Sequence, residues 1–330
     1  LVAPDFTWET VTQMDFGFDA SFLNNRLTGT FDWYRRNTKD MLVAGATLPA
    51  TLGASVPKSN SADMKTIGWE LSLGWNDRLE NGFSYWVKGV LSDYQATITK
   101  YAGNDAGFYS QSDGDGKYYV GKKIGEIGGY HSNGLFQSDD EAATIDQSEL
   151  YAGKWGAGDV KYEDLDNDGK ITKGEETIYN PGDKSIIGNK TPRYQFGITV
   201  GFDYKNFDFE MFWQGTGKRD YMLSGAQFWG FTSQWDVPYT PALDYWTETN
   251  TDAYFPRPGW QNGGNRVTSD RYLQSAAYGR LKNLTVGYTI PKNLTTKWGI
   301  SRLRLYVTGE NLLTITPLND AFDPETLGGM

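Results

Sequence analysis

Apolar and polar residues alternate with a period of two along several stretches of the chain, and this pattern most constrains the fold. In residues 14–22, MDFGFDASF, every second residue is apolar and the residues between them are Asp, Gly and Ser. A period of two places successive side chains on opposite faces of a β-strand. The alternation therefore predicts about eight strands, at 14–22, 27–36, 69–75, 83–91, 194–202, 207–213, 284–290 and 303–309.

The connections between these strands alternate between short and long. Short turns join the members of a pair, as at residues 23–26, where Asn tolerates the positive φ of a hairpin turn. Long excursions join one pair to the next, at 37–63, 102–191 and 218–275. The sheet is thus expected to carry tight turns at one end and large loops at the other, an asymmetry typical of outer-membrane barrels.

The polar face of these strands is strongly charged. Ionised groups are costly in the core of a sandwich but are tolerated in the watery lumen of a barrel. The expected fold class is therefore all-β, an antiparallel transmembrane β-barrel segment with long extracellular loops. A soluble β-sandwich whose polar face is its outer surface remains the alternative. The charged residues on this face are Asp15, Asp19, Asp32, Glu70, Asp203, Asp208 and Glu210.

Charge and composition restrict the partners. The net charge of −10 argues against binding to nucleic acid, which requires a basic surface. Cys is absent, which excludes disulfide scaffolds and thiolate metal sites. No apolar run approaches the ~20 residues that a membrane helix needs. If the chain meets membrane lipid, it must do so with strands.

The most specific chemical motif is the segment DLDNDGKITKGE, residues 164–175. It matches the D-x-[DN]-x-[DN]-G-x5-E pattern of a calcium loop, in which alternate residues point their oxygens at one ion. Its flanks lack the apolar repeat of EF-hand helices, which favours a structural Ca²⁺ site over a sensor. An acidic, solvated turn without an ion is the alternative. The predicted ligands are the side chains of Asp164, Asp166, Asp168 and Glu175, the carbonyl of Lys170, and Thr172 directly or through water.

Aromatic residues crowd the excursion 218–275. Such side chains stack on sugar rings or pack against a partner. They also bury area, which a long loop needs if it is to be ordered, so a small core of their own is the competing interpretation. The candidates for a substrate-facing or partner-facing surface are Trp229, Trp235, Trp246 and Trp260.

The sequence predicts that the chain is not an enzyme. His131 is its only histidine, and no G-x-S-x-G nucleophile motif is present. Neighbouring carboxylates, which a glycosidase would use, are expected by chance among 41 acidic residues.

Several sequence blocks, taken together and in order, resemble one known family. They are residues 4–9 with 22–42, 158–162 with the acidic segment, 187–194, 281–291, 303–312 and 322–325. In this order they are similar to the SusC/RagA family of TonB-dependent outer-membrane transporters.

The resemblance implies a 22-stranded barrel with an N-terminal plug, a SusD-like surface lipoprotein over its mouth, and energy from the TonB complex. Residues 1–330 are then expected to be the C-terminal portion of the barrel, without the plug domain and the final strand. The implied function is TonB-dependent import of an oligomeric nutrient, glycan or peptide, across the bacterial outer membrane. The four tryptophans would face substrate or lipoprotein, and Ca²⁺ would order the longest extracellular loop. A soluble, calcium-stabilised β-rich carbohydrate-binding or adhesion module is the alternative.

Overall fold

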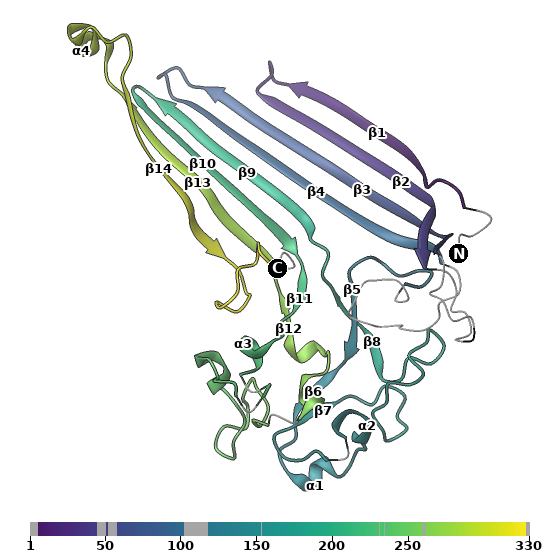
Figure 1. The fold of residues 1–330 in the computed structure, drawn as a ribbon. Helices are drawn as coiled ribbons and strands as arrows, with labels where there is room; N and C mark the ends of the chain where they lie inside the picture. Colours follow the sequence, from purple (N-terminus) through teal and green to yellow (C-terminus); the bar gives the residue numbers. More distant parts are fainter. Residues whose placement is uncertain are drawn as a thin grey trace.

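Eight antiparallel strands form one continuous sheet, called the wall below (Figure 1). Its order is β1-β2-β3-β4-β9-β10-β13-β14. The computed structural model describes residues 6–44, 51, 58–101, 118–152, 154–230, 232–233, 235–259 and 262–327. The wall strands are β1 Thr10–Phe22, β2 Leu27–Ala44, β3 Lys58–Arg78, β4 Ser84–Tyr101, β9 Arg193–Tyr204, β10 Phe207–Lys218, β13 Tyr278–Thr289 and β14 Arg304–Ile315.

Every strand predicted from the alternation is present. The predicted short turns close three of the four hairpins, whereas residues 290–303 form a longer connection in the fourth. In the first turn Leu23, Asn24 and Asn25 all have positive φ. β1 and β14 each pair with one neighbour only, so the barrel is not closed by these eight strands. The predicted fold class, an antiparallel barrel segment, is confirmed.

The two faces of the wall differ as the alternation requires. Apolar side chains on one face are exposed, such as Phe16 (66%) and Val307 (76%). The other face pairs polar residues across strands, for example Asp32 with Glu70. On this face Arg304 forms an ion pair with Asp208 across β13. The apolar face is thus available to lipid, and the polar face to water.

The prediction of an irregular excursion at 37–63 is wrong at both ends. Residues 37–44 continue β2, and residues 58–63 belong to β3. The alternation fails here because the ladder bulges around Asp40, which has a positive φ. Side chains replace the missing ladder bonds: the N–H of Asp40 donates to Asp63, and the amide of Asn60 donates to the carbonyl of Asp40. At about 3.3 Å per residue, β3 is longer than a bilayer core of ~30 Å requires.

The two longer excursions emerge from one end of the wall and contain short elements (Figure 1). The first excursion, residues 102–192, contains β5 Glu126–Tyr130, β6 Ser132–Leu135, α1 Asp139–Ala142, α2 Ser148–Tyr151, β7 Val160–Tyr162 and β8 Lys184–Asn189. The second excursion, residues 219–277, contains β11 Asp220–Met222, α3 Ala226–Trp229, η2 Thr240–Leu243, η3 Gly263–Arg266, η4 Asp270–Tyr272 and β12 Leu273–Ser275. α4 Lys292–Thr295 and η5 Thr296–Trp298 lie at the opposite end, between β13 and β14.

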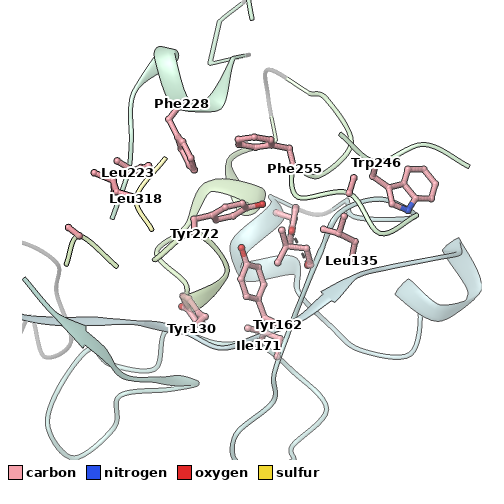
Figure 2. Close-up of a cluster of buried hydrophobic side chains, with 14 residues drawn as sticks. Tyr130, Leu135, Tyr162, Ile171, Leu223, Phe228, Trp246, Phe255, Tyr272 and Leu318 are labelled. Carbon is pink, nitrogen blue, oxygen red and sulfur yellow. Dashed lines mark hydrogen bonds between the residues drawn. The ribbon is translucent and has the colours of Figure 1, made fainter. Parts of the chain in front are cut away.

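The main cluster of buried hydrophobic side chains lies in the excursions (Figure 2), and only a few of the described wall residues, such as Ala62 and Ile98, are buried. Both excursions contribute to it, and Leu318 joins from the segment after β14. Among the described residues, none of the helices has the length and apolar character needed to cross a membrane. The buried members are Tyr130, Leu135, Tyr151, Val160, Tyr162, Ile171, Leu223, Phe228, Trp246, Ala253, Phe255, Tyr272, Ala276 and Leu318.

Candidate functional site in the loop assembly

The described residues of the two excursions, together with residues 316–327, form one packed unit that we call the loop assembly. Tyr162 of the first excursion and Tyr272 of the second are both fully buried. Phe228 packs edge-on against Phe255, with ring centroids 5.2 Å apart. The core interpretation of the aromatic residues is therefore supported, but the core is shared between the excursions.

A buried carboxylate connects the two excursions. Asp159 is completely buried and accepts hydrogen bonds from Asn262 (2.6 Å), Asn265 (2.9 Å) and Arg257 (3.1 Å) of the second excursion. The backbone N–H of Gly156 donates a fourth bond at 2.9 Å. A buried charge is tolerated only when it is paired and hydrogen-bonded, and Asp159 meets both conditions.

Asn265 extends this network into the first excursion. Its side-chain oxygen accepts bonds from the hydroxyl of Tyr151 and the N–H of Val160, both at 2.8 Å. The hydroxyl of Tyr162 donates to the carbonyl of Gly264 at 2.6 Å. Burial raises the pKa of Tyr151 and of Tyr162, so both hydroxyls stay protonated and act as donors. The two excursions thus share both apolar and polar contacts.

Residues 316–327, which follow β14, connect the loop assembly to the wall. Arg280 of β13 donates to Asp323 at 2.8 Å and to Glu325 at 2.7 Å. Arg219, at the start of the second excursion, donates to the carbonyls of Pro324 and Leu327. These contacts join β13, the second excursion and the segment after β14 at the end of the wall that carries the loops.

The acidic turn, residues 164–175, curls around Asp164. The carboxylate of Asp164 accepts bonds from the N–H groups of Asn167 (2.7 Å), Asp168 (3.2 Å) and Gly169 (2.7 Å). Although desolvation opposes the shift, these N–H donors hold the pKa of Asp164 below its usual value. Gly169 has φ +85°, which the sharp turn requires and which glycine adopts without strain.

Asp183 completes an acidic group that the sequence pattern did not identify. One carboxylate oxygen each from Asp164, Asp166 and Asp183 lie within 4.8 Å of one another. Asp183 is 1% exposed and accepts bonds from the N–H groups of Leu165 (2.8 Å) and Thr172 (2.7 Å). Desolvation, followed by the charges of Asp168 and Asp183, raises the pKa of Asp166. The group thus has the hard oxygen donors that Ca²⁺ prefers.

The other predicted ligands lie elsewhere in the turn. Asp168 accepts a bond from the N–H of Lys170, and Thr172 contacts Asp183 through its own N–H. The N–H of Glu175 donates to the carbonyl of Asn180. Among the described residues, the three-carboxylate group includes neither Asp168 nor Glu175. No spacing rule links Asp183 to the motif, so only its contacts reveal it.

The candidate tryptophans differ in exposure. Trp246 is buried against Gly158, where a side chain would collide with the indole ring and where φ is +84°. Trp229 packs edge-on against Tyr272, with ring centroids 4.6 Å apart. Trp235 is 84% exposed, and Trp260 lies outside the described residues. Its exposure makes Trp235 the strongest of the three described candidates for contact with another molecule.

Trp235 belongs to an exposed apolar segment in the second excursion. Val237 is 78% exposed, Leu243 58% and Tyr239 57%. Tyr239 also lines a pocket of about 320 Å³ together with Phe228 and Phe322. Large exposed apolar groups that gather in one segment are a common mark of interaction sites.

Comparisons with known proteins support the barrel interpretation. Residues 2–312 match the model of the family described as TonB dependent receptor-like, beta-barrel. TonB-dependent receptor P3 of Formosa agariphila is 31% identical over 96% of this chain and 31% of its own length. TonB-dependent receptor SusC of Bacteroides thetaiotaomicron is 26% identical over 98% of this chain and 30% of its own length.

A solved structure shows the same fold. The RagAB peptide transporter aligns with a TM-score of 0.71 and 22% identity, over 98% of this chain and 33% of that one. The chain thus spans about a third of the length of the curated relatives it matches. Its long family match, its wall with one apolar and one polar face, and its solved neighbour agree. The chain belongs to the TonB dependent receptor-like, beta-barrel family.

Proposed function

We propose that this chain forms part of a receptor that imports an oligomeric nutrient across the bacterial outer membrane with energy from the TonB complex. The family match over residues 2–312 carries the proposal. The fold agrees with it, because the exposed apolar face of the wall suits lipid and the polar face suits an aqueous lumen. The loop assembly would then lie on the extracellular side, since both excursions leave the wall at one end.

The cargo class is a glycan or a peptide. The test uses a strain of the source bacterium that lacks the receptor gene, grown on oligomeric glycans or on peptides as the sole nutrient. If the receptor imports an oligomeric nutrient, the deletion strain should fail to grow on either the glycans or the peptides and should grow normally on the monomers of that class. Normal growth on both oligomer classes would contradict the proposal. Heat-dependent migration of the purified receptor in detergent gels provides an independent check, because barrels resist unfolding and soluble modules show no such shift.

A SusD-like surface lipoprotein is the proposed partner, and Trp235 the proposed contact. Support comes from the exposed apolar segment 235–243 on the loop side. Trp235→Ala should reduce the amount of lipoprotein that co-purifies with the receptor. Trp298→Ala is the matched control, because Trp298 is 57% exposed but belongs to η5, next to α4 at the opposite end of the wall. Equal recovery with both variants would exclude Trp235 from the interface.

The acidic turn is proposed to bind a structural Ca²⁺ ion that braces the first excursion. Asp164, Asp166 and Asp183 would supply carboxylate oxygens. In the competing set, which the motif predicts, Asp164 and Asp166 are joined instead by Asp168, Lys170, Thr172 and Glu175. Bound Ca²⁺ would offset the repulsion among the carboxylates. Ile171, which is 1% exposed, anchors the turn in the core, so ordering the turn would order its surroundings.

Two variants distinguish these ligand sets. Protease sensitivity of residues 118–192 is measured with Ca²⁺ and after chelation, and the difference isolates the contribution of the ion. Asp183→Asn should abolish the difference, whereas Glu175→Gln should leave it unchanged. The reverse result would favour the ligand set that the motif predicts. No effect of chelation on the unaltered receptor would reject the calcium site.

A further inference from the structure

A serine, a histidine and an aspartate form a hydrogen-bonded chain between the two excursions. Nδ1 of His131 lies 2.7 Å from Oδ2 of Asp270, and its Nε2 lies 2.6 Å from Oγ of Ser185. The other carboxylate oxygen of Asp270 accepts the N–H of Ser132 at 2.9 Å. His131 and Ser185 belong to the first excursion and Asp270 to the second. One imidazole therefore bridges both.

The same atoms meet in serine hydrolases, but the setting of Ser185 is different. A nucleophilic serine sits on a strained turn beside N–H donors that stabilise an oxyanion. Ser185 instead lies within β8, opposite Gly129 in the ladder with β5. The geometry therefore favours a structural contact.

Backbone contacts next to His131 also join the two excursions, so the histidine adds to an existing interface. The N–H of Tyr130 donates to the carbonyl of Thr268 at 2.9 Å. Tyr130 also forms a parallel bridge with Ser269, next to Asp270. The side chains of His131 and Asp270 are 33% and 37% exposed, so this contact lies nearer the surface than the buried Asp159 network.

We propose that Ser185, His131 and Asp270 form a clasp that couples the two excursions at this edge of the loop assembly, so that local opening of one loosens the other. Both bonds can form in either charge state of the imidazole. Nδ1 donates to Asp270 in both states, while Nε2 accepts from the Ser185 hydroxyl when neutral and donates to its oxygen when protonated. A displacement of one excursion is then transmitted to the other, which is a coupling free energy between them.

Hydrogen exchange of the purified receptor in detergent tests the clasp. His131→Phe keeps a ring but removes both bonds. It should raise exchange about five- to tenfold in segments 126–135 and 264–275, as expected for the loss of one or two hydrogen bonds, and leave β9 and β10 unchanged. Glu149→Gln is the control, because Glu149 pairs with Lys173 inside the first excursion. It should affect the first excursion only.

A double-mutant cycle measures the coupling directly. Ser185→Ala and Asp270→Ala each break one bond to the same imidazole. Asp270→Ala also removes the acceptor of the Ser132 N–H, but this cost is present in the single and the double variant and cancels in the cycle. Expressed as free energies, the combined effect on exchange should be smaller than the sum. Unchanged exchange of segment 264–275 in His131→Phe, or additive effects in the cycle, would overturn the clasp. Covalent labelling of Ser185 by a fluorophosphonate would also overturn it and identify a nucleophile instead. None of these readouts depends on cargo import.

Discussion

The wall and the loop assembly place their large apolar side chains in opposite ways. In the wall, Phe16, Val286 and Val307 are exposed on one face. In the loop assembly, Tyr162 and Tyr272 are fully buried in a shared core. The wall therefore needs an apolar environment for its exposed face and further strands to pair with its two edges. The loop assembly instead supplies its own apolar contacts. The two regions should respond differently to substitutions, solvent and pH.

Truncation of the loop core should have the largest effect. Tyr162→Ala removes a fully buried ring and its bond to Gly264, and should destabilise the loop assembly by about 3–5 kcal/mol. Protease cleavage within the excursions should rise while heat-dependent gel migration of the barrel persists. Tyr179→Ala is the control, since Tyr179 is 81% exposed. Loss of the barrel together with the loops would show that the two regions are not separable.

A charge on the apolar face of the wall should have the next largest effect. Val307→Arg would place a cation in lipid and should cost about 2–4 kcal/mol near the bilayer midplane. Thr308→Arg places the same side chain on the opposite face and should cost much less. Denaturant titration of the receptor in lipid vesicles measures both. Equal costs would contradict the assignment of the two faces.

Removal of the charge at Asp159 should have a smaller effect, limited to the junction between the excursions. Asp159→Asn leaves buried donors without a charged acceptor, which should cost about 1–3 kcal/mol. Hydrogen exchange should increase around residues 156–160 and 262–265. Asp140→Asn, at an exposed position of α1, is the control. An effect confined to one excursion would weaken the view that they form one unit.

Acidification should have the smallest effect, again in the loop assembly. The N–H of Gln137, followed by the Lys161 ammonium, holds the pKa of Glu141 below its usual value. A lowered folded pKa means that the stabilisation is present above the unfolded value, about 4.3, and is lost as pH falls through the folded value. The loss should stay below about 1 kcal/mol, because the pair is partly exposed. Protection factors of residues 137–142, which correct exchange rates for their intrinsic pH dependence, measure it at pH 7 and pH 3, and Glu141→Gln should reduce the difference.

Sequence patterns predicted the wall better than its loops. The strands were identified because alternation is local and the polar residues fall on one face. The prediction failed around Asp40, where a bulge shifts the register. It therefore missed residues 37–44 of β2 and residues 58–63 of β3. Such a bulge depends on hydrogen bonds between the backbone of Asp40 and the side chains of Asn60 and Asp63, which no local pattern shows.

The candidate site was predicted only in part. The acidic turn was found because its residues are close in sequence, but Asp183 comes after two further turns marked by Gly174 and Gly182, both with positive φ. The tryptophans were identified by type, and their burial could not be assigned without the partners of Trp246 and Trp229. His131 was noted as the only histidine, yet its contacts with Ser185 and Asp270 depend on both excursions.

The sequence by itself determined the existence and order of the wall strands, their two faces and the end of the wall from which the loops emerge, because a period of two and the order of turns are properties of neighbouring residues. Only the tertiary structure decided which residues meet inside the loop assembly. Asp159 with Asn265, His131 with Asp270, and Asp166 with Asp183 each join residues that the chain separates widely. Their meeting depends on how the shared core packs, which is a property of the folded chain as a whole.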